Sequence, residues 1–470
     1  MPDAQVSTLI LFDLLAFLVP VGLTLLAIGA SREEHAEEVA TSALLALAAA
    51  LVGYFLCGFA FQFGGVASLA GMHGLASLTA EWSPLDLAWG PGWGLIGLRG
   101  FLLQSQAYNA DAYLLFASQL AAVTTAVLIV LLAICNHTRR TVQLAIGLLV
   151  SGLIYPLFGN WLWGGGWLSN LGTTLDLGHG LVDVAGSGAV FLLGALAAQS
   201  VFLIVKPRRA SEPGPVRLPP VHFPLWMVVG ALLAVVGWPG LVLGNALAYG
   251  QVQMPLVLVN LVLGAAGGAL AVSLYSWFVT SKPDGMAVGR GTVAGLVAVS
   301  AACAFVPAWA ALTIGLGAGL LFVLGLYVWE HWLRIDDPSG SAATFALPGL
   351  WGLLALAVFA DGRWGAGWNR VGLQEYRGIA GQGVSGLVLA PGFQPNGSAQ
   401  LYAQLTGVGA LLVVALLLPW LIFKAALWIG NLGEPVPSAA VPATTAPSSE
   451  EQPAVDSEQV ESPDSEEGAT

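Results

Sequence analysis

The stretch from Leu175 to Ala198 reads LDLGHGLVDVAGSGAVFLLGALAA. One carboxylate, Asp183, opens an apolar run that carries no further charge until Lys206, and this run is long enough to cross a bilayer as a helix. Four small residues, Ala185 to Gly188, allow a neighbouring backbone to approach closely. An acid where a membrane helix begins is costly in hydrocarbon and marks a candidate functional position. The stretch therefore predicts a packed membrane helix with a polar end.

The composition of the whole chain is that of a membrane protein. Of its 470 residues, 57% are hydrophobic and 9% are charged, whereas soluble proteins carry roughly 25% charged residues. The net charge of −12 is concentrated at one end, because nine acids and no Lys or Arg follow from Glu434 onward, which leaves −3 for the remainder. We predict a transmembrane domain over residues 1–432 and a disordered, acidic cytoplasmic tail over residues 433–470.

Apolar segments of membrane-spanning length follow one another along the transmembrane domain. We predict eleven, over residues 6–30, 40–64, 112–135, 141–160, 181–205, 221–247, 253–280, 286–304, 308–333, 342–360 and 398–428. Eleven of the fifteen Lys and Arg residues fall at alternate connections, and the positive-inside rule places that side in the cytoplasm. The chain is then an all-α, multi-pass protein of the inner (cell) membrane, with its N-terminus outside and its C-terminus inside.

The stretch from His179 to Val190 resembles the fifth-helix signature of the ammonium transporter (Amt/Rh) family. In that signature an Asp-x-Ala-Gly-Gly/Ser motif precedes a pore histidine that lies eight residues after the aspartate. Other elements resemble family motifs and occur in the family's order and spacing. They are Trp163-Gly-Gly-Gly166, Gly237-Trp238-x-Gly240, Lys282-Pro283 with Gly291 to Val297, Arg334 to Pro338, and Gln400-Leu401 with Gln404-Leu405.

The resemblance implies a homotrimer with one narrow pore per subunit, formed by two inverted five-helix repeats and wrapped by an eleventh helix. It implies selective passage of ammonium, deprotonated on the way, or of ammonia. In such a pore, aromatic faces and a hydroxyl recruit the cation from outside, and two histidines offer it polar partners. The family's Gly-Leu-Asp-containing C-terminal segment is replaced here by Gly433-Glu434-Pro435, which argues against regulation by the PII signalling protein.

Carried over position by position, the resemblance places Trp163 at the outer-site tryptophan and Asp183 at the acid that holds backbone amides beneath the mouth. The remaining pore positions differ from the family: Leu120 and Leu241 replace two gate phenylalanines, Asn245 replaces the recruiting serine, and Phe191 and Pro348 replace the two pore histidines. The six histidines of the chain lie elsewhere, near helix ends or in loops, so they do not restore the missing pair.

A lumen lined at its midpoint by Phe191 and Pro348 offers no titratable group, so it resists a cation more than a small neutral molecule. We therefore predict a membrane channel or transporter that moves ammonium, ammonia or a similar small neutral molecule through a narrow hydrophobic pore. The alternative is a non-conducting relative that acts as a membrane sensor or structural subunit. The sequence contains no carboxylate pair, nucleophile–base pair or metal-ligand spacing, so we expect no enzyme activity, cofactor, metal or nucleic-acid partner.

Two further ionisable residues lie within apolar segments. Asp13 has no counterpart that we recognise in the family, and it is either a functional group inside the membrane or a residue at the outer interface. Arg290 stands where the family has a small or amide residue at the start of the eighth segment. It either faces the inner vestibule, where its charge would repel cations, or extends to the lipid headgroups.

Overall fold

The computed structural model describes the chain except for residues 1–2, 69–71, 208–222, 249, 338 and 429–470. The predicted acidic tail, residues 433–470, therefore lies wholly outside the described residues. Within the described part, ten apolar helices are long enough to span a membrane, and a shorter apolar helix brings the total to eleven. The prediction of an all-α bundle of eleven membrane helices is confirmed.

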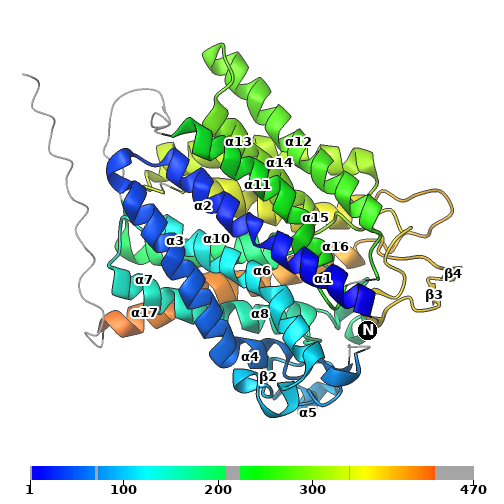
Figure 1. The fold of residues 1–470 in the computed structure, drawn as a ribbon. Coiled ribbons are helices and arrows are strands. Elements are labelled where there is room, and N and C mark those ends of the chain that lie inside the picture. Colours follow the sequence, from blue (N-terminus) through cyan, green and yellow to red (C-terminus); the bar gives the residue numbers. More distant parts are fainter. Residues whose placement is uncertain (1–2, 69–71, 208–222, 249, 338, 429–470) are drawn as a thin grey trace, which may run out of the picture.

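The eleven helices form two five-helix halves and a last helix. Figure 1 labels most of their elements along the ribbon. The first half consists of α1 (Asp3–Ala16) with α2 (Leu18–Ala30), α3 (Glu33–Gly53) with η1 (Tyr54–Gly58) and α4 (Phe59–Phe63), α6 (Ala110–Ile134), α7 (Arg140–Leu149) with η6 (Val150–Ile154) and α8 (Tyr155–Trp163), and η7 (Ser187–Leu192) with α10 (Leu193–Val205). The second half consists of α11 (Pro224–Leu243), α12 (Met254–Thr280), α13 (Gly285–Val299), α14 (Ala308–Tyr327) with η8 (Val328–Leu333), and η9 (Ala342–Ala346) with α15 (Leu347–Phe359). The last helix comprises α16 (Ala399–Leu411), η11 (Leu412–Leu417) and α17 (Leu418–Trp428).

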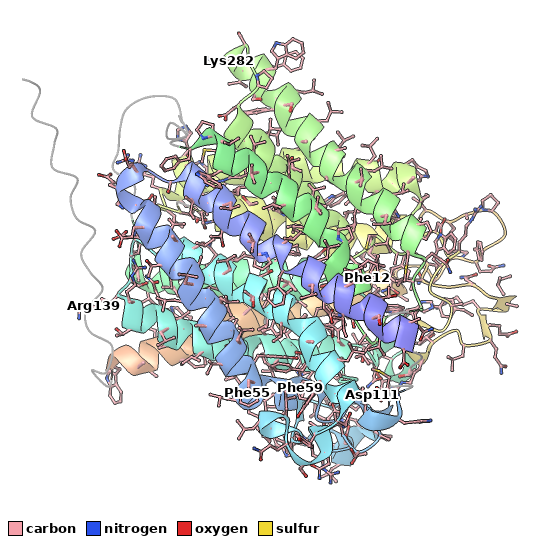
Figure 2. All side chains as sticks on the ribbon, in the orientation of Figure 1. Phe12, Phe55, Phe59, Asp111, Arg139 and Lys282 are labelled. Atoms are coloured by element: carbon pink, nitrogen blue, oxygen red, sulfur yellow. The ribbon has the colours of Figure 1, made fainter. Side chains whose placement is uncertain are left out.

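The long connections before α6 and before α16 lie at one end of the bundle, which we call the loop side. They contain α5 (Asp86–Trp89) and two short antiparallel pairs, β1 (Glu81–Trp82) with β2 (Ile96–Gly97) and β3 (Glu375–Tyr376) with β4 (Ile379–Ala380). Another loop-side connection contains α9 (Leu171–Thr174). Arg139 and Lys282 lie away from this end, and we call the opposite end the basic side (Figure 2).

The first helix of each half packs against the other through glycines. A Cβ atom added to Gly22 of α2 would lie 2.5 Å from the carbonyl oxygen of Gly230 in α11, and a Cβ added to Gly230 would lie 2.5 Å from the carbonyl oxygen of Gly22. Such contact is open only to residues without a side chain, and it brings the two backbones together by van der Waals packing. This seam joins the two halves.

The fifth helix of each half begins with a π-helical turn, η7 in the first half and η9 in the second. Turns of this kind are rare and are frequent at functional sites. Both are buried, and η7 packs against η9 and α15. The two π-turns therefore lie together inside the bundle, between the two halves.

Candidate functional site

Trp163 ends α8 on the loop side, and its indole N–H donates a hydrogen bond to the backbone carbonyl of Asp183 at 3.0 Å. The indole is half-buried, and its ring centroid lies 6.5 Å from that of Tyr155. The hydrogen bond fixes the indole beside the start of η7. Trp163 thus stands at the loop-side approach to the π-turns.

The carboxylate of Asp183 is fully engaged by backbone amides. One oxygen accepts from Gly186 N–H at 3.0 Å, and the other accepts from Gly188 at 2.8 Å and from Ala189 at 3.0 Å. Although Gly186 is the residue directly before the helix, the carboxylate of Asp183 satisfies the first free amides of η7 and is favoured by the positive end of the helix. With 1% of its surface exposed, Asp183 holds the helix start in place and does not face the approach.

The start of the fifth helix differs from the prediction. We predicted a helix from residue 181, but the helix begins at Ser187 and residues 181–186 are irregular. The physical reason is Gly186, whose backbone φ of +84° is left-handed and ends the irregular segment. Asp183 therefore lies before the helix and caps it.

Ser187, the first residue of η7, joins the two halves. Its hydroxyl donates to the carbonyl of Val297 at 2.6 Å and accepts from the amide of Ala301 at 2.7 Å. The amides of Val184 and Ala185 also donate to the carbonyls at 301 and 300. The irregular segment before η7 is thus paired with the segment that follows α13.

Four buried side chains form a hydrogen-bonded polar network near Trp163. The Tyr54 hydroxyl donates to Gln62 at 2.9 Å, the Gln62 amide donates to Gln119 at 3.2 Å, and the Tyr155 hydroxyl donates to the same Gln119 oxygen at 2.9 Å. We did not predict this polar network from the sequence. The available signal was a glutamine within each of two apolar segments, an arrangement that requires a partner inside the membrane.

Two of the three positions predicted around the mouth and gates lie on helices, and the third follows a helix end. Leu120 follows Gln119 on α6 and is half-buried. Leu241 is buried in the last turn of α11. Asn245 follows the end of α11, is 6% exposed, and accepts from the amide of Leu247 at 3.1 Å.

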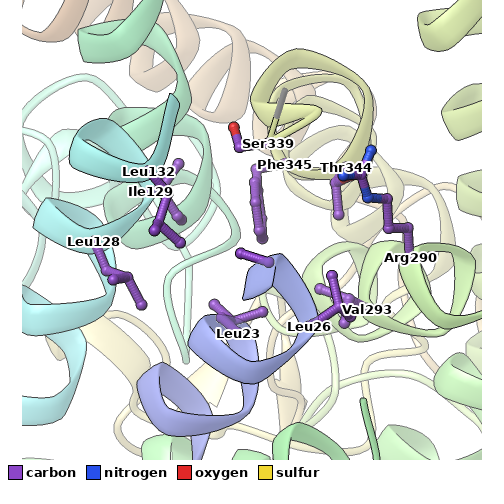
Figure 3. Close-up of a pocket in the computed structure, with 11 residues that line it drawn as sticks. Leu23, Leu26, Leu128, Ile129, Leu132, Arg290, Val293, Ser339, Thr344 and Phe345 are labelled. Atoms are coloured by element: carbon purple, nitrogen blue, oxygen red, sulfur yellow. The ribbon is translucent and has the colours of Figure 1, made fainter. Parts of the chain in front are cut away.

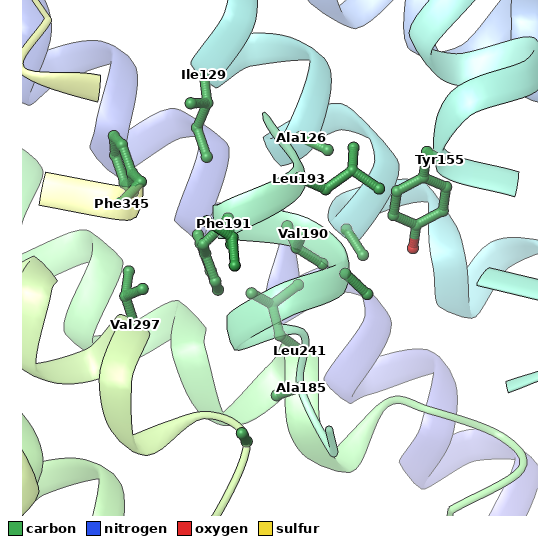
Figure 4. Packing of buried hydrophobic residues seen from close by; sticks show 14 of the residues in the cluster. Ala126, Ile129, Tyr155, Ala185, Val190, Phe191, Leu193, Leu241, Val297 and Phe345 are labelled. Atoms are coloured by element: carbon green, nitrogen blue, oxygen red, sulfur yellow. The ribbon is translucent and has the colours of Figure 1, made fainter. Parts of the chain in front are cut away.

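The centre of the bundle is an aromatic cluster around Phe191. The Phe191 ring stacks on Trp238 with 4.8 Å between centroids and on Phe345 with 6.2 Å, and both pairs have an interplanar angle of 11°. Phe191 and Trp238 are 0% exposed. Figure 4 shows Phe191 in the middle of its cluster, with Phe345 on one side and Leu241 on the other. These three rings contain no titratable group and fill the space between η7, η9 and α11.

Pro348 is buried in the first turn of α15, one turn beyond Phe345. Because the π-turn η9 leads directly into α15, Pro348 lies inside a continuous helical segment and removes one backbone donor there. Of the two residues that replace histidines, Phe191 is the one that belongs to the stacked aromatic cluster.

A small cavity lies on the basic side of Phe345 (Figure 3). Its volume of about 20 Å³ is enough for one water molecule. Most of the wall is aliphatic and comes from α2 and α6, while Arg290, Ser339 and Thr344 supply the polar groups. Because Phe345 lines this cavity and also stacks on Phe191, the cavity adjoins the aromatic cluster directly.

Arg290 is buried in α13, with 3% of its surface exposed. Figure 3 shows its guanidinium beside Thr344 at the cavity. Asp337, Glu330 and Asp284 interact with it electrostatically. Of the two interpretations drawn from the sequence, extension to the lipid headgroups is wrong, because the side chain is enclosed by protein and lines the cavity.

Glu81 and His179, both on the loop side, have shifted pKa values. Burial raises the pKa of Glu81 to about 7, although the Asn160 side chain and the charge of Arg370 oppose the shift. Burial lowers the pKa of His179 to about 4, so this imidazole is neutral at physiological pH. The His179 ring lies 4.5 Å from the ring of Tyr376. Within the described residues, no group of three or more His, Cys, Asp or Glu side chains could hold a metal ion.

The sequence matches the family model of the Ammonium Transporter Family over residues 7–433. The chain belongs to the ammonium transporter family. Ammonium transporter Amt2 of Archaeoglobus fulgidus is 32% identical over 355 residues, which cover 75% of this chain and 70% of that protein. Ammonium transporter Amt2 of Haloferax mediterranei is 29% identical over 383 residues, which cover 79% of this chain and 78% of that protein.

Solved structures of other proteins share the fold. The structure titled Sensor Amt Protein matches with a TM-score of 0.72 and 24% identity, covering 93% of this chain and 97% of that chain. Candida albicans Mep2 matches with a TM-score of 0.71 and 20% identity, covering 92% of this chain and 86% of that chain. The chain is thus a multi-pass membrane transporter of the ammonium transporter family, and the resemblance found in the sequence is confirmed.

Proposed function

We propose that this ammonium transporter family member carries ammonia, the neutral base, and leaves the proton of ammonium on the loop side. The stacked cluster of Phe191, Trp238 and Phe345 is the observation that carries the proposal. A bare cation among apolar side chains loses its hydration without compensation, whereas a neutral base loses far less. The cluster therefore favours ammonia over ammonium by its chemistry.

We assign recruitment of the cation to the approach near Trp163. An indole face attracts ammonium by a cation–π interaction, and the ring of Tyr155 lies close to it. Asn245 takes the place of the recruiting hydroxyl, with an amide that offers an oxygen. Asp183 supports recruitment indirectly. The hydrogen bonds that its carboxylate accepts from backbone amides fix the backbone carbonyl to which Trp163 donates.

We assign the gate to Phe191, together with Leu120 and Leu241 at the two gate positions. The stacked rings close the path in this conformation, so ammonia passes when the Phe191 ring turns away from Trp238. Pro348 stands at the second histidine position and contributes an apolar wall without a donor. Below the gate, the guanidinium of Arg290 lines the cavity next to Phe345.

We further propose that the loop side faces the cell exterior and that the protein is a homotrimer in the inner membrane. Eleven of the fifteen Lys and Arg residues support this orientation. Large apolar side chains cover the outer faces of α11 and α12, among them Leu225, Leu232, Val262 and Phe278. Such faces suit lipid or a neighbouring subunit.

Transport can be tested with the purified full-length protein in proteoliposomes. Stopped-flow measurement of internal pH reports ammonia entry, and current on a supported membrane reports ammonium movement. We expect entry faster than in empty vesicles and no ammonium-evoked current. A sustained current would contradict passage of the neutral base. Entry no faster than in empty vesicles, with entry restored in the Phe191→His/Pro348→His variant, would overturn the proposal and favour the non-conducting alternative.

A further inference from the structure

Asp13 is a buried carboxylate that does not belong to the aromatic cluster around Phe191. It lies in α1, which packs against α11 and α6, and 7% of its surface is exposed. A Cβ atom added to Gly244, the residue after α11, would lie 2.6 Å from Oδ1 of Asp13. The carboxylate is therefore held against the loop-side end of α11, in space that a glycine leaves open.

Neither oxygen of Asp13 has a hydrogen-bond partner among the described residues. Asp183 is the contrast within the same protein, since its two oxygens accept three backbone amides. Among the described residues, Asp13 also forms no ion pair with a Lys, Arg or His side chain. A buried carboxylate needs either hydrogen bonds or a positive charge to offset its lost hydration.

The environment of Asp13 adds negative potential. The last carbonyl groups of a helix lack partners within the helix, and the C-terminal end of a helix carries a partial negative charge. α11 ends at Leu243, and Gly244 donates to the carbonyl of Gly240 at 2.8 Å.

Asp13 also lies too deep in the membrane span for bulk water to hydrate its carboxylate. The first membrane span runs from Asp3 to Ala30, and Asp13 lies ten residues into it. This places it about 15 Å along the helix axis from the loop-side end. Because the hydrocarbon layer takes up about 30 Å of a span, the carboxylate lies within the loop-side half of that layer.

We propose that Asp13 and the C-terminal end of α11 form a binding site for one small monovalent cation. One carboxylate balances one positive charge, and carboxylate and carbonyl oxygens are suitable partners for ammonium or for an alkali cation. The site lies apart from the aromatic cluster, so it goes beyond the proposed passage of ammonia. Its occupancy stabilises the packing of α1 on α11.

The site can be tested by thermal unfolding of the purified full-length protein at constant ionic strength. The probes are the chlorides of ammonium, sodium and potassium, each compared with N-methylglucamine, which is too large to enter. A ligand that binds the folded state raises Tm with its concentration. We expect a rise of about 2 °C or more in at least one small cation. The arms distinguish ammonium from alkali cations.

Two variants should lose this response. Asp13→Asn removes the charge while keeping the shape, and Gly244→Ala places a methyl group against the carboxylate. Asp3→Asn, at the exposed start of the same helix, is the matched control and should respond as the native protein does. An equal Tm of the native protein in all four salts would overturn the proposal, as would a full response in Asp13→Asn. A protonated-carboxyl infrared band that Asp13→Asn removes would also overturn it, because the group would then hold a proton.

Discussion

The phenyl ring of Phe191 lies parallel to the indole of Trp238, with 4.8 Å between their centroids and 11° between their planes. Trp238 is held by a hydrogen bond from its indole N–H to the hydroxyl of Ser300 at 2.7 Å. Phe191 has no polar atom in its side chain and is held by packing alone. Of the two rings, Phe191 is therefore the one that can turn without breaking a hydrogen bond.

We expect Phe191→Ala to increase ammonia entry into proteoliposomes by about tenfold, because the variant removes a gating step worth about 1.4 kcal/mol. Stopped-flow measurement of internal pH checks this. Phe158→Ala is the matched control, since Phe158 is equally buried but lies in α8 outside the aromatic cluster. Each truncation should cost about 3–5 kcal/mol of stability. Because both variants are destabilised to a similar extent, faster ammonia entry in Phe191→Ala alone is explained by the loss of a gate. Equal rates in the two variants would contradict the gate.

Asp183→Asn should destabilise the protein by about 3 kcal/mol. An asparagine has a single acceptor oxygen and an amide group, and that amide would face N–H donors which now point at a carboxylate. Thermal unfolding in detergent measures the loss. Asp176→Asn is the control, because Asp176 is largely exposed and should leave Tm unchanged. A native Tm in Asp183→Asn would show that the cap contributes little.

Gly186→Ala should destabilise by about 2 kcal/mol, because its backbone has a φ of +84°. Its Cβ would also lie 2.3 Å from a methyl group of Val190. Gly409→Ala is the matched comparison, since a Cβ added there meets nothing within 4 Å. Gly409 lies in α16, and its replacement by alanine should stabilise the protein by about 0.5–1 kcal/mol. The two variants should thus shift Tm in opposite directions, and shifts of the same sign would refute the argument.

Glu81 should make stability fall as pH rises. Its pKa is raised by burial from 4.5 to about 7, so between these values the folded state binds more protons than the unfolded state. Stability then decreases from pH 4.5 to 7 and stays lower above pH 7, with a total loss of about 1–2 kcal/mol after allowance for partial exposure. Glu81→Gln should remove this part of the pH dependence of Tm. Glu375→Gln, an exposed residue in β3, should not change it.

The sequence predicted the helices well because each depends on the length of an apolar run. The start of the fifth helix was wrong because it depends on the left-handed backbone of Gly186, which an apolar run does not reveal. The polar network was missed because Gln62 and Gln119 lie 57 positions apart and meet only in the folded bundle. The stacking of Phe345 on Phe191 depends likewise on how the two halves fit together. The roles of the candidate pore residues remain predictions.

The hydroxyl of Ser187, in the first half, is hydrogen-bonded to two backbone groups of the second half at the middle of the bundle. A transporter that works by alternating access must rock one half against the other, and such rocking would break these short hydrogen bonds inside the membrane in every cycle. Two halves that are hydrogen-bonded to each other at the centre are instead suited to passage through a static framework, in which a single side chain moves. Turnover should then follow the rotation of one ring and show the shallow temperature dependence of a channel.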